Sequence, residues 1–347
     1  MNHLPLGNTG LKVPPIVFGT SCLGNLYEAL PFATKLAIMR EYFLHVRPPV
    51  VLDTAGKYGA GLALEVIGRG LRELGVPPEH VVISNKLAWL QVPLRGPEPT
   101  FEPGAWKDLK HDAEQKISYD GIRECWKQGY RLLGDPYRPK LASVHDPDEY
   151  LARPGTEAEQ RQRHDDILGA YRALTELKAE GAFKAIGVGS KDWTVIRTLA
   201  DAVQLDWVML ACSLTIMTHP PELLRFVESL RGRGIGIINS AVFHAGFLTG
   251  GPFFDYRKPD PKNPDDKRLF EWRAKFMALC RRHGVSPAAA CVRFAMSPPG
   301  VVSISLNTSK PERVEENAAL VQAEVPARFW TALKDEGLVA KDYPYLG

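Results

Sequence analysis

Apolar residues recur along the chain in eight short, nearly continuous runs, and amphipathic segments separate most of them. Such runs are typical of strands that are buried on both faces of a parallel sheet. They occupy residues 16–20, 50–55, 81–87, 140–146, 183–190, 207–212, 234–241 and 301–307. Helical spacing is found at residues 32–46, 119–134, 165–181, 221–234, 269–284 and 287–296, and also directly after the second run. The alternation predicts an α/β fold with a parallel sheet covered by helices.

Eight strand–helix units favour a closed (β/α)8 TIM barrel over an open sheet. The turn after the first run reads GTSCLGN and lacks both the G-x-G-x-x-G and the P-loop pattern of open nucleotide-binding sheets. The opening PLGNTGLKVP predicts an N-terminal β-hairpin that turns at residues 8–10. Long connections at 88–117 and 243–266 follow strands, so we expect functional loops at the carboxyl-terminal face of the barrel. No linker divides the chain, which predicts one barrel domain over residues 1–347.

Composition narrows the classes of function. Hydrophobic residues make up 45% of the chain and charged residues 24%, which allows a large core. The net charge of +3, without a run of Lys and Arg, argues against nucleic-acid or membrane partners. The first residues do not resemble a signal peptide, and the glycines in 234–254 favour a strand and loop over a membrane span. The five cysteines form no C-x-x-C pair, which predicts a reduced, cytoplasmic protein with no disulfide or metal site.

Titratable residues follow three consecutive predicted strands. The second strand carries Asp53, with Tyr58 in its loop, the third carries Lys86, and the fourth carries His145, each towards its carboxyl end. Barrel enzymes carry their chemistry at the carboxyl ends of the strands, so these side chains should face one place. An ammonium lowers the pKa of a nearby phenol, a carboxylate is its counter-ion, and an imidazole can hold a carbonyl oxygen. The combination predicts a proton donor aimed at a carbonyl, which suits hydride transfer with a bound cofactor.

Each of these residues also has an ordinary structural interpretation. Asp53 could cap a helix, Tyr58 could be a packed ring, Lys86 could be solvated, and His145 could belong to a turn. Their joint placement at three successive strand ends favours catalysis. A lyase that uses Lys86 as a Schiff-base nucleophile is a second hypothesis, but a carboxylate partner such as Asp53 disfavours the neutral amine that it needs.

The motifs DTAGKYG, ISNKL and SVHDPD, which hold these four residues, resemble the catalytic tetrad of the aldo-keto reductases. The opening LGNTGLKVPPIVFGT and the late SKPERVEEN resemble that family as well, and the segment SYDGIRECWKQGYRLLG is most similar to the bacterial aldose and L-fucose dehydrogenase-like branch. The resemblance implies that Tyr58 is the acid/base, that Lys86 and Asp53 tune it, and that His145 orients the substrate. A regulatory subunit that binds a cofactor on the same barrel, as in the potassium-channel β-subunits, remains an alternative.

The resemblance also implies an NAD or NADP cofactor and a small carbonyl compound or sugar as substrate. The residues at family cofactor positions are Thr20, Ser190, Asn239, Ser240, Gly246, Leu248, Asn307, Thr308, Arg313, Glu316 and Asn317. We assign Tyr27, Trp89 and Trp106 to the substrate, the last two because aromatic rings in the loop 88–117 can stack on a sugar. The family often has Gln on the sixth strand and an aromatic ring on the seventh, where this chain has Leu210-Ala211 and Asn239.

The choice of dinucleotide depends on the end of the last strand. Relatives that use NADP commonly have Lys or Arg where Asn307 lies, and Asn cannot neutralise a 2′-phosphate. Lys310 and Arg313 lie close by and favour NADP. We give the neutral Asn307 slightly more weight than these two cations and expect a small preference for NAD. The substrate, the direction of reaction and the oligomeric state, a homo-oligomer included, stay open.

Overall fold

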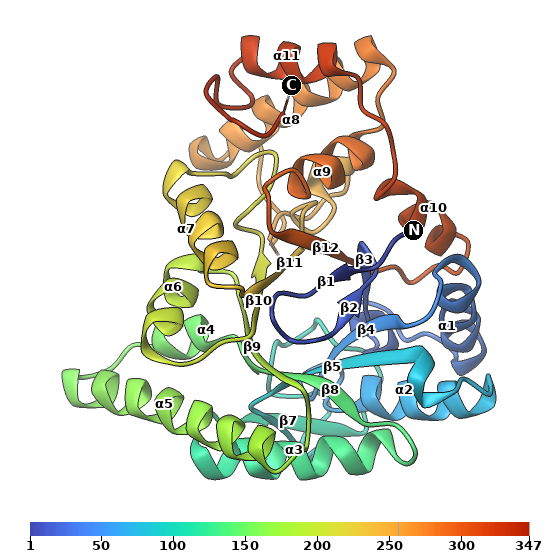
Figure 1. Cartoon of the computed structure of the whole chain (residues 1–347), viewed down its shortest axis with the longest axis vertical. Helices are drawn as coiled ribbons and strands as arrows, with labels where there is room; N and C mark the ends of the chain where they lie inside the picture. Colours follow the sequence, from blue (N-terminus) through green and yellow to red (C-terminus); the bar gives the residue numbers. More distant parts are fainter. Residues whose placement is uncertain (256, 347) are drawn as a thin grey trace.

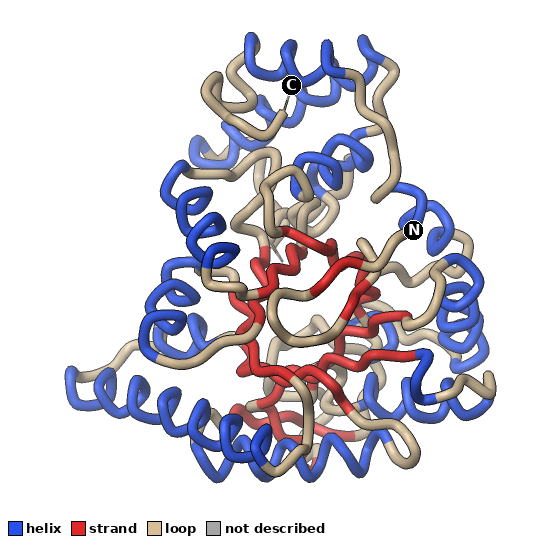
Figure 2. Tube along the Cα trace, viewed as in Figure 1, coloured by secondary structure: helices blue, strands red, loops and turns tan. Residues whose placement is uncertain are grey.

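The computed structural model describes residues 1–255 and 257–346, and its centre is a closed parallel barrel. Its strands are β3 (Ile16–Gly19), β4 (Val50–Ala55), β5 (Val81–Leu87), β8 (Pro139–His145), β9 (Ala185–Ser190), β10 (Trp207–Ala211), β11 (Gly236–Ser240) and β12 (Val301–Leu306). Neighbouring strands pair in parallel, and β12 pairs with β3 to close the ring. Figure 2 shows these strands in red, enclosed by helices in blue. The predicted (β/α)8 barrel is confirmed, with its eight strands in the predicted order.

Helices surround the barrel, and α8 and α11 extend beyond it on one side, at the top of Figure 1. The helices are α1 (Phe32–His45), α2 (Leu62–Glu73), α3 (Tyr119–Leu133), α4 (Pro147–Leu151), α5 (Glu157–Ala179), α6 (Trp193–Ala202), α7 (Pro221–Gly232), α8 (Pro264–His283), α9 (Pro287–Ala295), α10 (Arg313–Leu320) and α11 (Ala327–Asp335). Within the described ranges, no helix has both the length and the apolar character needed to cross a membrane.

Helix α5 begins well before the predicted residue 165 because its first turn is capped. Thr156 Oγ1 accepts a hydrogen bond from the Glu159 backbone N–H, and the Glu159 carboxylate accepts one from the Thr156 backbone N–H. This reciprocal capping box satisfies donors that a helix otherwise leaves unpaired. The polar residues that follow Thr156 therefore continue the helix on its solvent side.

The amino-terminal end of the barrel is closed by the predicted hairpin of β1 (Leu4–Pro5) and β2 (Lys12–Val13). The Asn8 backbone N–H donates to the carbonyl of Gly234, just before β11, at 2.8 Å. Side chains of the hairpin pack against Trp207 and the other apolar residues inside the barrel. A Cβ on Gly187 would lie 2.3 Å from the Trp207 ring, so only glycine fits there. Apolar packing fills this end and leaves the opposite end for polar side chains.

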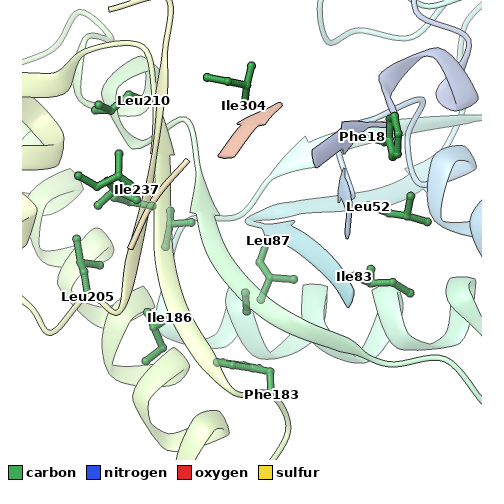
Figure 3. Packing of buried hydrophobic residues seen from close by; sticks show 14 of the residues in the cluster. Phe18, Leu52, Ile83, Leu87, Phe183, Ile186, Leu205, Leu210, Ile237 and Ile304 are labelled. Carbon is green, nitrogen blue, oxygen red and sulfur yellow. The ribbon is translucent and has the colours of Figure 1, made fainter. Parts of the chain in front are cut away.

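The outer face of the barrel packs against the helices. Figure 3 shows Phe18, Leu52, Ile83, Ile186 and Ile237, which come from different strands and belong to one buried cluster. A second buried cluster joins α8, α9 and α11 and includes the short 3-10 helix η3 (Phe247–Thr249). The barrel wall is thereby supported from outside along its length.

The two long connections differ in their secondary structure. The segment 88–117 contains an antiparallel hairpin of β6 (Trp89–Pro93) and β7 (His111–Gln115). The segment 243–266 contains η3 and the first turn of α8. Two further 3-10 helices are η1 (Ser21–Gly24) and η2 (Pro78–His80). Both long connections follow barrel strands and lie at the carboxyl end, as expected from the sequence.

Candidate active site

Adjacent strands bring a carboxylate and an ammonium into contact at the carboxyl end of the barrel. Asp53 on β4 lies opposite Ser84 on β5, and Lys86 follows Ser84 on the same face. Lys86 Nζ donates to Asp53 Oδ2 and to Tyr58 Oη, the second at 3.0 Å. Ser84 Oγ donates to Asp53 Oδ1 at 3.1 Å. The Asp53 and Lys86 side chains are almost fully buried, so this ion pair is held in a fixed geometry.

A tight turn carries Tyr58 from the end of β4 back over this ion pair. Gly59 has a φ of +63°, and a Cβ there would lie 2.3 Å from the carbonyl oxygen of Gly24. This close approach of two backbone segments requires glycine at position 59. The Tyr58 ring then lies beside Trp106, with ring centroids 6.1 Å apart. The turn thus fixes the phenol between Lys86 and the loop 88–117.

His145 ends β8 and lies on the other side of the phenol. Its ring meets the Tyr58 ring edge-on, with centroids 5.6 Å apart. Its Nε2 lies 3.4 Å from Asp146 Oδ2, and its buried Nδ1 has no hydrogen-bond partner among the described residues. Burial, together with Lys86 and Lys57, holds the pKa of His145 well below its ordinary value. The imidazole is therefore neutral near pH 7 and retains a polar nitrogen without a protein partner.

Burial and charge act in opposite directions on Tyr58 and Lys86. Burial raises the pKa of Tyr58, Lys86 lowers it, and Asp53 raises it again, so that the pKa stays above its ordinary value. The expectation of a lowered phenol pKa is therefore wrong for the protein without ligands, because burial outweighs the ammonium. Burial alone lowers the pKa of Lys86, but Asp53 and Tyr58 together raise it above its ordinary value. At neutral pH the site holds a protonated phenol beside a charged ammonium.

These four side chains line a cavity of about 1030 Å³ at the carboxyl end of the barrel. Most of the other residues that the sequence assigns to ligands also line it, and they come from separate loops. Those residues are Tyr27, Trp106, Ser190, Ser240, Gly246, Asn307, Thr308, Arg313, Glu316 and Asn317. We call the part around Tyr58, Tyr27 and Trp106 the substrate half, and the part around Asn307 and α10 the cofactor half.

Four of the assigned residues do not line the cavity. The Asn239 side-chain amide donates to the carbonyls of Leu214 and Ala295, and its oxygen accepts the Ser240 backbone N–H. Thr20 Oγ1 donates to the carbonyl of Asp53. The remaining two are buried in apolar clusters: Leu248 packs near α8 and α9, and Trp89 packs with Phe101.

The alternation of side chains along β11 excludes Asn239 from the cavity lining. Ile238 packs inside the barrel, whereas Ile237 belongs to the cluster outside it. Consecutive residues of a strand face opposite sides, so Ser240 and Asn239 cannot both face the cavity. Ser240 lines the cavity, and Asn239 faces outward.

The cavity also contains charged and aromatic residues that the sequence analysis did not select. Lys57, Glu102, Asp146 and Lys191 line the substrate half, and Phe243 follows β11 on the cavity wall. Lys57 and Asp146 are the direct neighbours of Tyr58 and His145 in their motifs, which was a usable signal. Glu102 lies within the loop 88–117, and its sequence context carries no comparable signal.

The barrel is closed and parallel, and its strand ends bring a phenol, an ammonium, a carboxylate and an imidazole to one cavity. These features place the chain in the class of TIM-barrel enzymes. Within that class, the chain belongs to the aldo/keto reductase family, whose profile matches residues 15–335.

Two curated relatives are similar over nearly their whole length. Pyridoxal 4-dehydrogenase from Microbacterium luteolum is 30% identical, with 96% of this chain and 97% of the relative covered. D-threo-aldose 1-dehydrogenase from Pseudomonas sp is 28% identical, with 95% and 96% covered. Family membership and these relatives make the chain an NAD(P)-dependent oxidoreductase.

A solved structure agrees with the fold. The aldo-keto reductase AKR11C1 from Bacillus halodurans, in its holo form, superposes with a TM-score of 0.70 at 19% identity. The superposition covers 98% of this chain and 96% of that chain.

Proposed function

We propose that this protein transfers a hydride between a nicotinamide dinucleotide and the carbonyl or hemiacetal carbon of a sugar or related aldehyde. The observation that carries the proposal is the position of Lys86 Nζ. It lies between the Asp53 carboxylate and Tyr58 Oη, at the floor of a cavity that His145 also lines. No other arrangement of described titratable side chains in that cavity provides a phenol that is both hydrogen-bonded and next to an imidazole.

Tyr58 is the proposed acid/base. In reduction the phenol gives its proton to the substrate oxygen, and the Lys86 ammonium stabilises the phenolate that remains. Asp53 keeps Lys86 charged and in place, because their contact is buried. His145 is neutral, so one ring nitrogen can donate a hydrogen bond to the carbonyl oxygen without supplying a second acidic proton. A bound nicotinamide supplies or accepts the hydride.

The residues of the cofactor half suit a dinucleotide. Lys310 and Arg313 line this half and, among the residues that the structure describes, neither side chain takes part in an ion pair. Arg313 is also the first residue of α10, and a helix N-terminus favours negative charge. The volume of about 1030 Å³ lies at the upper end for ligand sites, which suits a dinucleotide together with a small substrate. Ser190, Ser240, Gly246, Thr308, Glu316 and Asn317 complete the proposed binding site.

We propose a small preference for NAD over NADP. Asn307 lies just beyond β12, and its Nδ2 donates to Ser21 Oγ at 2.7 Å. A neutral amide held in this way suits a ribose hydroxyl better than a 2′-phosphate. Lys310 and Arg313 act against this preference because either can pair with that phosphate.

The sugar or aldehyde substrate is supported by the relatives, two of which are named as dehydrogenases of an aldose and of pyridoxal. The site favours catalysis over the regulatory-subunit alternative, because it holds all four side chains that the proposed chemistry needs, and Lys86 links Asp53 to Tyr58. The Schiff-base alternative requires a neutral lysine, and Asp53 keeps the pKa of Lys86 above its ordinary value despite burial.

A substrate panel tests the proposal. Neutral aldoses and aldehydes would be assayed in both directions with NAD(H) and NADP(H), following nicotinamide absorbance. We expect turnover with at least one neutral aldose or aldehyde and a modest advantage for NAD. Absence of nicotinamide-dependent turnover across the panel would contradict the proposal. Borohydride trapping of a substrate on Lys86 would favour the lyase instead.

A further inference from the structure

The substrate half contains a buried lysine, Lys57, that is surrounded by carboxylates. This lysine has no role in the proposed proton transfer. Lys57 Nζ lies 2.7 Å from Glu102 Oε1, 3.0 Å from Asp146 Oδ2 and 3.4 Å from Glu149 Oε2. Its side chain is only 5% exposed. Burial by itself lowers the pKa of Lys57, but these three carboxylates raise it above its ordinary value. The ammonium is therefore charged and already surrounded by anionic partners.

The other ammonium groups of the substrate half are paired as well. Lys191 Nζ lies 2.6 Å from Glu149 Oε1, and Lys86 pairs with Asp53. His145 is neutral, and Glu28 adds a carboxylate to the cavity lining. Among the described residues of this half, carboxylates thus outnumber ammonium groups. The described side chains of the substrate half therefore carry an excess of negative charge.

Glu102 connects this charged network to the aromatic wall. While Oε1 pairs with Lys57, Oε2 accepts a hydrogen bond from Trp106 Nε1 at 2.8 Å. Trp106 in turn packs beside the Tyr58 ring. The backbone of Glu102 has a φ of +45°, a conformation that non-glycine residues rarely adopt. One carboxylate therefore positions both the ammonium and the indole at the mouth of the cavity.

The opposite half has the reverse character. Lys310 and Arg313 are exposed there and make no ion pair within the part of the chain that the structure describes. Anionic groups are therefore favoured at one end of the cleft and disfavoured at the other. A carboxylate accepts hydrogen bonds from hydroxyl groups, whereas it repels phosphate and carboxylate groups.

Building on the proposed function, we propose that Glu102 and Asp146, held around Lys57, select uncharged polyhydroxylated carbonyl substrates and reject their phosphorylated or carboxylated counterparts. Hydroxyl groups of the substrate donate to these carboxylates beside Tyr58. Among the side chains that the structure describes in the substrate half, an anionic substituent finds no unpaired cation to offset its charge. Glu102 is in this account a specificity-determining residue for the reaction at Tyr58.

The test compares kcat/KM for D-glyceraldehyde, D-glyceraldehyde 3-phosphate and D-xylose, the last as an uncharged substrate with added bulk. We expect the wild-type enzyme to prefer glyceraldehyde over its phosphate by about 100-fold, as like-charge contacts in binding sites commonly impose. The preference should shrink as salt is raised from low to about 0.5 M, because added ions screen exposed charges. Turnover of xylose should change little with salt.

Glu102→Gln keeps an oxygen that can accept the Trp106 N–H but removes the charge. We expect it to narrow the preference for glyceraldehyde over its phosphate by about 10-fold, which is about 1.4 kcal/mol. Asp146→Asn is the second variant, in case Glu102→Gln disturbs the loop. Glu180→Gln is the matched control, because Glu180 pairs with Arg123 on the outside of the barrel, 3.0 Å away, and should leave the ratio unchanged.

The outcomes separate this inference from the proposed function. Equal kcat/KM for glyceraldehyde and its phosphate would overturn the inference alone. A preference that neither salt nor either variant changes would also overturn it, because the phosphate would then be rejected by its size. If no neutral aldose or aldehyde of the panel, glyceraldehyde and xylose included, is turned over with NAD(H) or NADP(H), the proposed function itself fails.

Discussion

The two halves of the cleft are built in different ways. In the substrate half, charged side chains from barrel strands and their loops are buried and paired, as Lys86 is with Asp53 and Lys57 is with Asp146. In the cofactor half, neutral polar groups and exposed cations such as Arg313 come from the loop after β12 and from α10. The first arrangement holds its groups in place before a ligand arrives, whereas the second offers charge to a ligand that brings phosphates.

Proton transfer belongs to the substrate half, and Tyr58→Phe should reduce catalysis there most severely. The ring and its packing against Trp106 remain, but the proton is lost. We expect kcat to fall by about 10²–10⁴-fold, the usual contribution of a positioned acid or base. The dissociation constant for the dinucleotide, measured by fluorescence titration, should stay within about twofold. Full activity in this variant would remove Tyr58 from the mechanism.

Lys86→Met tests how the buried charges tune the phenol. Lys86 lowers the pKa of Tyr58, so its removal should raise that pKa further above the ordinary value. Oxidation needs the phenolate, and its rate should therefore rise only at a higher pH than in the wild-type enzyme. Reduction uses the protonated phenol, so the decline of its rate at alkaline pH should also move to higher pH, while its rate below that decline falls with the loss of the ammonium. The measurement is the pH profile of kcat/KM in both directions.

Neither wild-type profile should show a titration of His145 between pH 6 and 8, because burial keeps the pKa of this imidazole well below its ordinary value. A step in that range that disappears in His145→Gln would contradict the assignment of a neutral imidazole.

Asn307→Lys tests how the cofactor half distinguishes NAD from NADP. The new ammonium would lie where Asn307 now contacts Ser21, at the lining of the cleft. We expect the specificity constant for NADP to improve by roughly 10-fold or more relative to NAD, as a charged hydrogen bond typically gives. A wild-type enzyme that already prefers NADP by about 10-fold would show that Lys310 or Arg313 supplies the charge that Asn307 lacks.

Trp106→Ala and Trp89→Ala separate a cavity ring from a packing ring in the same loop. Trp106 lines the cavity, whereas Trp89 packs beside Phe101 and does not line it. Trp106→Ala should raise the KM for an aldose several-fold through lost ring contacts. Trp89→Ala should leave that KM unchanged and lower the melting temperature, because a buried ring is removed. The opposite pattern would show that the two rings have been assigned the wrong way round.

Several features of this molecule were predictable from the sequence because they depend on local pattern. The barrel strands followed from apolar runs, and Asp53, Lys86 and His145 were found because each lies towards the carboxyl end of such a run. The network around Lys57 was only partly predictable, because Asp146 adjoins His145 in its motif but Glu102 reaches Lys57 from the loop 88–117. Sequence also placed two tryptophans in one loop without showing which ring faces the cavity.

The sign of the Tyr58 pKa shift was mispredicted for a related reason. The expectation counted the nearby ammonium but not the burial of the phenol, which is the larger effect. Burial depends on the Trp106 ring and on the turn that brings Gly59 against Gly24, and both are tertiary contacts.

The central claim is that one cleft has two halves with separate tasks, and a crossed pair of variants tests it most directly. The KM for an aldose and the dissociation constant for the dinucleotide would be measured for Arg313→Ala and Trp106→Ala. We predict that Arg313→Ala weakens dinucleotide binding by about 10-fold and leaves the KM for an aldose within about twofold. Trp106→Ala should do the reverse. If either variant changes both constants to the same extent, the two halves do not act separately and the account is contradicted.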